Sequence, residues 1–176
     1  MRPIKFVPFV IAAASMVAIP AMASAGSGNV GFGFNAGNIS GFPTGSAFLT
    51  GGGSFNPGTG AVHSGGGFRC TSDIQQGPLA GCAAGEGVRW DTVELLAGTN
   101  LKCTGAATEA LSHADTDGHT AVLRADFYRA GDGNEESFTA LMVVADHDIA
   151  AGVDGVQNVW IQGVGCDLAT TNFSAK

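Results

Sequence analysis

Residues 120–129, TAVLRADFYR, and residues 137–145, SFTALMVVA, flank the turn-forming run GDGN at positions 131–134. In the first segment every second side chain is apolar, and the positions between include Arg124 and Asp126. This period of two is typical of a strand with one buried face. The second segment has no charge and is apolar at both alternating sets of positions. We therefore predict a β-hairpin whose second arm is a central strand covered on both faces.

Candidate strands recur along the rest of the chain. They are residues 46–55, 60–70, 88–96, 99–106, 156–164 and 168–173. The run Asn56-Pro57-Gly58-Thr59 joins the first two and has the central Pro and Gly that a type II turn prefers. The glycine triplets at 51–53 and 65–67 predict kinks that lie opposite each other in a curved sheet.

An isolated hairpin is marginal in water, so the other strands must flank this one and close over it. Patterns of helix length are nearly absent, and the turn signals come at hairpin spacing. We expect an all-β fold, either an antiparallel β-barrel or a β-sandwich, with a calycin-like barrel favoured.

The N-terminus has the features of a secretory signal. Arg2 and Lys5 precede an apolar run that ends at Pro20 and the small-residue triplet at 23–25. These features predict cleavage after Ala25 and export to the periplasm or the extracellular space. The mature chain shows no second hydrophobic span.

The expected organisation has three parts. Residues 1–25 are the signal peptide, residues 26–45 are a Gly/Phe-rich segment that is a candidate for a flexible tail, and residues 46–176 form a single antiparallel β domain. After cleavage the chain is long enough for one domain with a core, and too short for two comfortable ones.

The charge pattern bears on partners. The full chain has a net charge of −7 at pH 7, from eight basic and fifteen acidic residues. Two of the basic residues and none of the acidic ones lie in residues 1–25, so the mature chain is more acidic still. Its basic residues are scattered singly, whereas phosphate neutralisation needs clusters. We expect no nucleic-acid partner; a small-molecule or surface ligand stays open, and the sequence does not indicate an oligomeric state.

Four cysteines, an even number, predict two disulfides in an oxidising compartment. Three pairings are open, of which we favour Cys70–Cys82 and Cys103–Cys166. The second closes the longer loop and stabilises by about 4 kcal/mol in the loop-entropy model. A zinc site built from four thiolates is disfavoured because the chain has no C-x-x-C pair.

A candidate metal site lies where every second residue is a potential ligand, His113-x-Asp115-x-Asp117-x-His119. On a strand these side chains would share one face, and His147 could complete a set of His113, Asp115, His119 and His147. Imidazole with carboxylate suits Zn, Cu or Fe. The competing interpretation is a solvated loop, because Asp117-Gly118 favours a turn that would scatter the ligands. The sequence requires no cofactor, and a transition metal is the one cofactor for which it offers candidate ligands.

The polar face of the first hairpin arm, Arg124, Asp126 and Tyr128, is a weak catalytic candidate. If it faced a closed lumen, a desolvated Asp beside Arg could act as a general acid or base. If it faced water, it would be an exposed ion pair. We expect a non-enzymatic binding or structural role. The alternatives are a small barrel enzyme, a hydrolase or cyclase that uses lumen carboxylates, and a secreted transition-metal-binding protein.

Overall fold

The computed structural model describes residues 28–130 and 136–175, and in these ranges every regular element is a β-strand. The strands are β1 (Val30–Gly41), β2 (Ser46–Phe55), β3 (Val62–Ser72), β4 (Arg89–Leu95), β5 (Gly98–Leu101), β6 (Ser112–Asp115), β7 (Thr120–Arg129), β8 (Glu136–Ala145), β9 (Val159–Ile161), β10 (Gly165–Asp167) and β11 (Thr170–Ala175). The predicted all-β class is confirmed. Within these ranges no helix could cross a membrane.

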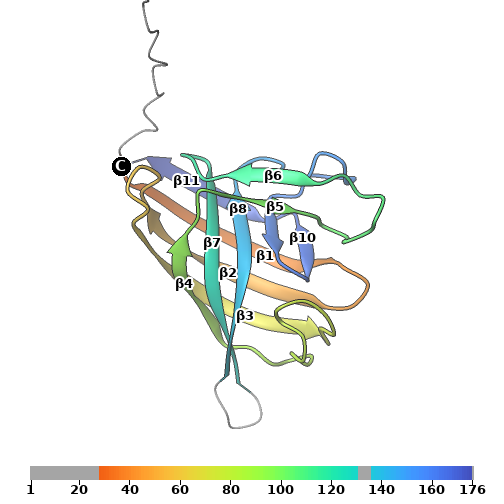
Figure 1. Cartoon of the computed structure of the whole chain (residues 1–176). Helices are drawn as coiled ribbons and strands as arrows, with labels where there is room; N and C mark the ends of the chain where they lie inside the picture. Colours follow the sequence, from red (N-terminus) through yellow and green to blue (C-terminus); the bar gives the residue numbers. More distant parts are fainter. Residues whose placement is uncertain (1–27, 131–135, 176) are drawn as a thin grey trace, which may run out of the picture.

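Eight strands close into an antiparallel barrel in the order β1, β2, β3, β4, β7, β8, β9, β10. Strand β10 closes the ring by pairing with the end of β1, where Ser40 lies opposite Cys166. Strand β11 pairs with the other half of β1, and β5 and β6 form a two-stranded sheet of their own. Figure 1 shows this small sheet lying across one end of the barrel. The barrel is therefore the architecture that forms, and not the sandwich.

The central hairpin forms as predicted. Strands β7 and β8 pair along their whole length, from Thr120 opposite Ala145 to Arg129 opposite Glu136. The predicted turn at 131–134 lies outside the described residues. The apolar positions of β7 point into the barrel, where Leu123 and Phe127 are fully buried.

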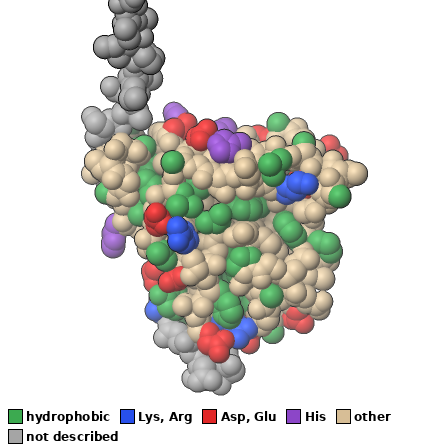
Figure 2. Space-filling view, viewed as in Figure 1, with side chains coloured by type: hydrophobic (Ala, Val, Ile, Leu, Met, Phe, Trp, Pro, Cys, Tyr) green, Lys and Arg blue, Asp and Glu red, His purple; other side chains and the backbone are tan. Residues whose placement is uncertain are grey.

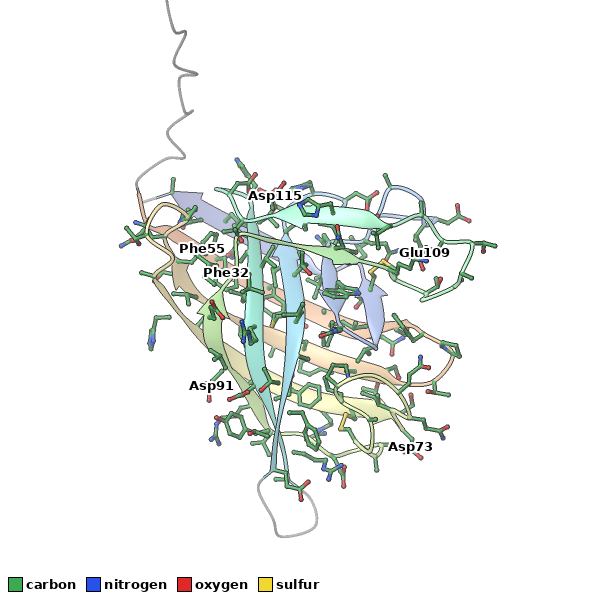
Figure 3. The ribbon with its side chains drawn as sticks, in the orientation of Figure 1. Phe32, Phe55, Asp73, Asp91, Glu109 and Asp115 are labelled. Carbon is green, nitrogen blue, oxygen red and sulfur yellow. A yellow bond between two sulfur atoms is a disulfide. The ribbon has the colours of Figure 1, made fainter. Side chains whose placement is uncertain are left out.

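Large apolar side chains fill the lumen. Phe55, Trp90, Phe127 and Met142 have at most 1% of their surface exposed, and Phe32 has 6%. Figure 3 shows Phe32 and Phe55 side by side within the barrel wall, and their rings meet edge to face at 5.6 Å between centroids. The lumen is thus the main hydrophobic core.

A second apolar cluster lies outside the barrel wall. It joins Val122 of β7 and Val143 of β8 to Leu101 of β5 and to Trp160 of β9. The Trp160 indole donates to the carbonyl oxygen of Lys102 at 2.9 Å. From Ala140 to Ala145 the two faces of β8 therefore contact different cores, as predicted for a central strand covered on both sides. Nearer the turn the outer face is not covered, because Ser137 and Thr139 are exposed.

The two glycine triplets lie opposite each other, as predicted, with Gly51 paired with Gly66 and Gly52 with Gly65. The strands approach so closely here that side chains do not fit. A Cβ on Gly66 would lie 2.0 Å from the carbonyl oxygen of Thr50, and one on Gly51 would lie 2.5 Å from that of Gly65. This part of the wall therefore depends on glycine.

Of the predicted segment 26–45, the described residues 28–45 are not separate from the domain. Most of them belong to β1, whose Phe32 and Phe34 are each 6% exposed and pack in the lumen. The barrel therefore begins near residue 30 and not at residue 46. The expectation of a tail overlooked these phenylalanines as core residues. The signal peptide predicted at 1–25 lies outside the described residues.

Two smaller expectations also differ from the structure. In the turn after β2 the left-handed glycine is Gly60, with φ of 73°, and Gly58 does not have a positive φ. The Asn56 side chain accepts hydrogen bonds from the backbone N–H groups of Gly58 and Thr59, and this Asx turn replaces the expected type II turn. Near the C-terminus, Gly165–Asp167 forms β10, a strand that lies between the predicted strands 156–164 and 168–173.

Both favoured disulfides are present, Cys70–Cys82 and Cys103–Cys166, with Cα–Cα distances of 6.3 and 5.0 Å. The first staples the loop between β3 and β4, whose Ile74 and Leu79 are each 1% exposed and belong to the lumen core. The second ties the segment after β5 to β10. The described chain has no free cysteine.

Candidate functional site

Most of the titratable side chains singled out in the sequence gather at one end of the barrel. Figure 2 shows histidine and acidic side chains together along the upper edge of the molecule. We call this group the histidine rim and define it as His113, Asp115, His119, Asp146 and His147. The first two belong to β6, His119 immediately precedes β7, and the last two follow β8.

The predicted ligand ladder is broken after Asp115. Strand β6 ends there, and the backbone bends through residues 117–119 before β7 begins. The Asp117 carboxylate accepts a hydrogen bond from the backbone N–H of His119 at 2.8 Å, which stabilises the bend. His113 and His119 therefore do not share a strand face, because the Asp117-Gly118 turn separates them.

His113 is held by two neighbours. Its Nδ1 lies 2.8 Å from the side-chain oxygen of Asn100 on β5, and its Nε2 lies 2.9 Å from a carboxylate oxygen of Asp115. Both contacts come from the β5–β6 ladder, in which His113 lies directly opposite Asn100. The imidazole is thus oriented by the small sheet that covers the barrel end.

Asp146 joins the other two histidines. One of its carboxylate oxygens lies 2.7 Å from Nδ1 of His119, and the other lies 3.2 Å from Nδ1 of His147. The hydrogen bond and charge of Asp146 raise the pKa of His119. Burial alone would raise the pKa of Asp146, but the hydrogen bonds and charges of His119 and His147 outweigh it and lower that pKa.

Three of the four predicted metal ligands, His113, Asp115 and His147, line one depression of about 400 Å³. His119 lies beside it, in contact with Asp146. Within residues 28–130 and 136–175, no group of three or more His, Cys, Asp or Glu side chains is arranged to hold a metal ion. The metal site therefore stays a prediction, for which the structure supplies the neighbourhood and not the coordination.

The polar face of β7 points away from the lumen. Arg124 pairs with Glu94 on β4, and the Asp126 carboxylate accepts a hydrogen bond from the Thr139 hydroxyl at 2.6 Å. The Arg89 guanidinium lies over the ring of Tyr128, 4.1 Å from the ring centroid. The structure therefore brings each of Arg124, Asp126 and Tyr128 to a cross-strand partner on the outer surface, and not to a catalytic cavity.

Sequence reasoning missed a groove on the outside of β2 and β3. Its volume is about 700 Å³, and its lining includes Phe48, Arg69, Thr71 and Val88. We call it the Phe48 groove. A signal for it exists in the sequence: Ala47 and Leu49 are buried in the lumen, so the alternation of the strand places the aromatic ring of Phe48 outside.

Comparison of the chain with protein-family models, with curated proteins and with solved structures gives no match.

Proposed function

We propose that this protein is an exported, non-enzymatic binding domain that uses the outside of its barrel. The observation that carries the proposal is the filled lumen, in which Trp90, Phe127 and Leu123 are fully buried. Small eight-stranded barrels that bind a ligand internally leave a cavity for it. Here apolar side chains occupy that space, so contact with a partner falls to outward side chains.

The order of the strands supports a calycin-like barrel as the fold type, because the strands of the ring follow one another as an up-and-down meander. Export is supported by the two disulfides, which fit an oxidising compartment. It also rests on the predicted signal at residues 1–25. The mature domain is then a small, covalently stapled binding module in the periplasm or outside the cell.

The alternative of a barrel enzyme has little support. No carboxylate is among the buried residues of the described chain, whose buried polar side chains are those of Asn56, Thr120 and Asn158. A lumen acid or base needs a desolvated titratable group. Asp126, the candidate for this role, lies outside and is hydrogen-bonded to Thr139.

The proposal is tested with the mature, oxidised chain and a panel of metal ions, oligosaccharides, peptides and lipids. We expect a ligand that raises the melting temperature and stays chemically unchanged over a day of incubation, as followed by one-dimensional NMR. Loss of its binding on substitution of outward side chains supports the proposal. Conversion of the ligand into a product, or binding that only lumen substitutions remove, contradicts it.

A transition-metal-binding role is the second candidate, and the geometry of Asp146 favours it. The Asp146 carboxylate is hydrogen-bonded to Nδ1 of both His119 and His147, so this carboxylate does not occupy the Nε2 atoms of the two rings. Carboxylates commonly orient metal-binding histidines in this way, through the ring nitrogen that does not bind the metal. His119 and His147 would supply two ligands, and water would complete the shell.

Elemental analysis of protein purified without affinity tags or chelators tests this second role, alongside His119→Ala and His147→Ala variants. His63→Ala is the control, because His63 lies on β3. Stoichiometric zinc, copper or iron that both rim variants lose and the control keeps supports the metal role. Absence of metal after equilibration with each ion rules it out.

A further inference from the structure

The outer face of β11, β1, β2 and β3 is almost without charge. These strands pair side by side, and Figure 1 shows β1, β2 and β3 running together across the barrel wall. One outward row crosses them as Thr170, Asn35, Thr50 and Gly67, each opposite the next. Adjacent strands lie about 4.8 Å apart, so the row presents hydroxyl and amide groups at a regular spacing.

The next outward row is lower. It consists of Asn172, Gly33, Gly52 and Gly65, again each opposite the next. Three glycines in succession have no side chains of their own, so the row is lower than its neighbours. Asn172 reaches over one end and Asp91 of β4 over the other, because a Cβ on Gly33 would lie 3.0 Å from Oδ1 of Asn172 and one on Gly65 would lie 2.8 Å from Oδ1 of Asp91. We call this low row the trough. The four strands place no charged side chain in it, hydrogen-bonding groups lie along its side, and the Asp91 carboxylate borders its β3 end.

The Phe48 groove lies at one end of this trough. Phe48 is half-buried and pairs across the strands with Arg69, which is exposed. Gly87 lies beside the backbone of Arg69, and the neighbouring Val88, which pairs with Phe68, exposes 51% of its surface. Gly67 and Gly87 line the groove between these side chains. An aromatic face and a planar guanidinium thus flank a surface with little relief.

Arg69 is the only charged side chain in the lining of the groove. Among the described residues no carboxylate forms an ion pair with it, whereas Arg89, Arg124 and Arg129 all pair with acidic side chains. A guanidinium has five N–H donors in one plane and no acceptor. The guanidinium of Arg69 therefore offers hydrogen-bond donors beside the ring of Phe48.

We propose that the Phe48 groove and the trough beside it bind a neutral oligosaccharide. One sugar ring lies against Phe48, and its hydroxyl groups accept hydrogen bonds from Arg69. Further sugar units lie along the trough, bonded to Asn35 and Thr50. This inference deepens the proposed binding function and rests on it.

The charge of the protein selects a neutral chain over an acidic one. The full sequence has a net charge of −7, which repels polyanions, and a single arginine does not offset this field. A neutral polymer pays no such penalty, and the trough has hydroxyl and amide groups to match its hydroxyls. A flat aromatic contact and convergent polar groups are also what ligand sites in general provide.

The test uses the mature, oxidised chain and isothermal titration calorimetry with neutral hexasaccharides of glucose, mannose, xylose and N-acetylglucosamine. A uronic-acid hexasaccharide serves as the acidic counterpart. We expect at least one neutral hexasaccharide to bind, and Phe48→Ala and Arg69→Gln each to weaken it by about tenfold or more, as for loss of an aromatic contact or a charged hydrogen bond.

Matched control variants lie off the groove. Val93→Ala removes an exposed apolar side chain from β4, and Arg124→Ala removes an outward arginine from β7. Both are expected to bind like the unmodified chain, and circular dichroism melting confirms that each of the four variants is folded.

Failure of every neutral hexasaccharide at millimolar concentration overturns the inference, as does unchanged binding by folded Phe48→Ala. Selective binding of the uronic-acid chain overturns the choice of a neutral ligand. The proposed function stands in all these cases if the wider panel of metals, peptides and lipids gives an unconverted surface ligand, and it fails separately if that panel gives turnover.

Discussion

The indole ring of Trp90 occupies the space that a side chain on Gly51 would need. A Cβ at Gly51 would lie 2.7 Å from Cζ2 of Trp90. The ring is fully buried, and its Nε1 donates to the carbonyl oxygen of Thr50 at 3.0 Å. Trp90, the largest side chain of the lumen, thus packs directly against the backbone of β2, because Gly51 has no side chain there. The glycine triplet of β2 is a packing requirement as much as a backbone one.

Gly51→Ala is expected to destabilise the barrel by about 1–3 kcal/mol, the usual cost of inserting atoms into a packed core. The added methyl group meets both Trp90 and the backbone of β3, and neither can withdraw without disturbing the wall. Urea unfolding followed by tryptophan fluorescence measures the change. Gly37→Ala is the control, because a Cβ at this position of β1 has nothing within 4 Å. Equal stability of the two variants would contradict the packing argument.

The disulfides are expected to contribute unequally. They close loops with sequence separations of 12 and 63 residues. Loop entropy gives about 3 kcal/mol for the shorter loop and about 4 kcal/mol for the longer one. A Cys103→Ala, Cys166→Ala double variant should therefore unfold at lower urea than a Cys70→Ala, Cys82→Ala double variant. The reverse order would mean that the stapled loop carrying Ile74 and Leu79 matters more than loop length.

Much of the fold could be predicted because its central strands have strong side-chain periodicity. The two arms around residues 131–134 differ in the charge on alternate positions, and this difference predicts one solvent-exposed face for β7 and none for β8. In the structure the outer faces of both strands are exposed near the turn, at Arg124 and Thr139, and buried farther from it. Strand β1 could not be found in the same way. Its outward positions include Gly31 and Gly33, so the contrast between apolar and polar positions that marks a strand is missing.

The candidate site could be predicted as a neighbourhood and not as a geometry. His113, Asp115 and His147 do line one depression, although they come from segments far apart in the sequence. The sequence could not show that Asp146 is hydrogen-bonded to two histidines at once, because this depends on where β8 ends relative to the start of β7. It also could not reveal that Arg124 and Asp126 face outward, because alternation alone does not say which face a closed barrel turns inward.

Glu109 is expected to make the stability of the fold depend on pH in the acidic range. Its carboxylate accepts hydrogen bonds from the backbone N–H groups of Cys103 and Thr104, at 2.5 and 2.8 Å. Burial opposes ionisation, but these bonds and that of the Thr104 hydroxyl outweigh it and lower the pKa of Glu109 below 4.5. A lowered carboxyl pKa stabilises the fold above the unfolded value, and this contribution disappears as pH falls through the folded value.

Glu109→Gln should therefore lower the melting temperature at pH 7, and the difference should shrink as the pH falls through the folded pKa of Glu109. Circular dichroism melts from pH 2 to pH 7 measure the difference between the two proteins. A gap of constant size across this range would show that the amide fails for steric reasons, and that charge is not what Glu109 contributes.

Asn158 is expected to be the polar side chain on which the end of the barrel depends most. It is 5% exposed, donates through Nδ2 to the carbonyl oxygen of Ala169 at 3.1 Å, and accepts from the Ala169 N–H at 2.7 Å. These two bonds imitate a strand pair and join the start of β9 to the start of β11. Asn158→Ala leaves two buried backbone groups without partners, at a cost of about 1–3 kcal/mol for each.

Asn158→Asp keeps the acceptor but loses the donor, so it should be destabilising as well, and more so at neutral pH, where its charge is buried. Urea unfolding measures both variants against Asn172→Ala, an exposed position on β11 that should change stability little. If Asn158→Ala matched that control, water would have to replace the amide, and the link between β9 and β11 would not depend on this side chain.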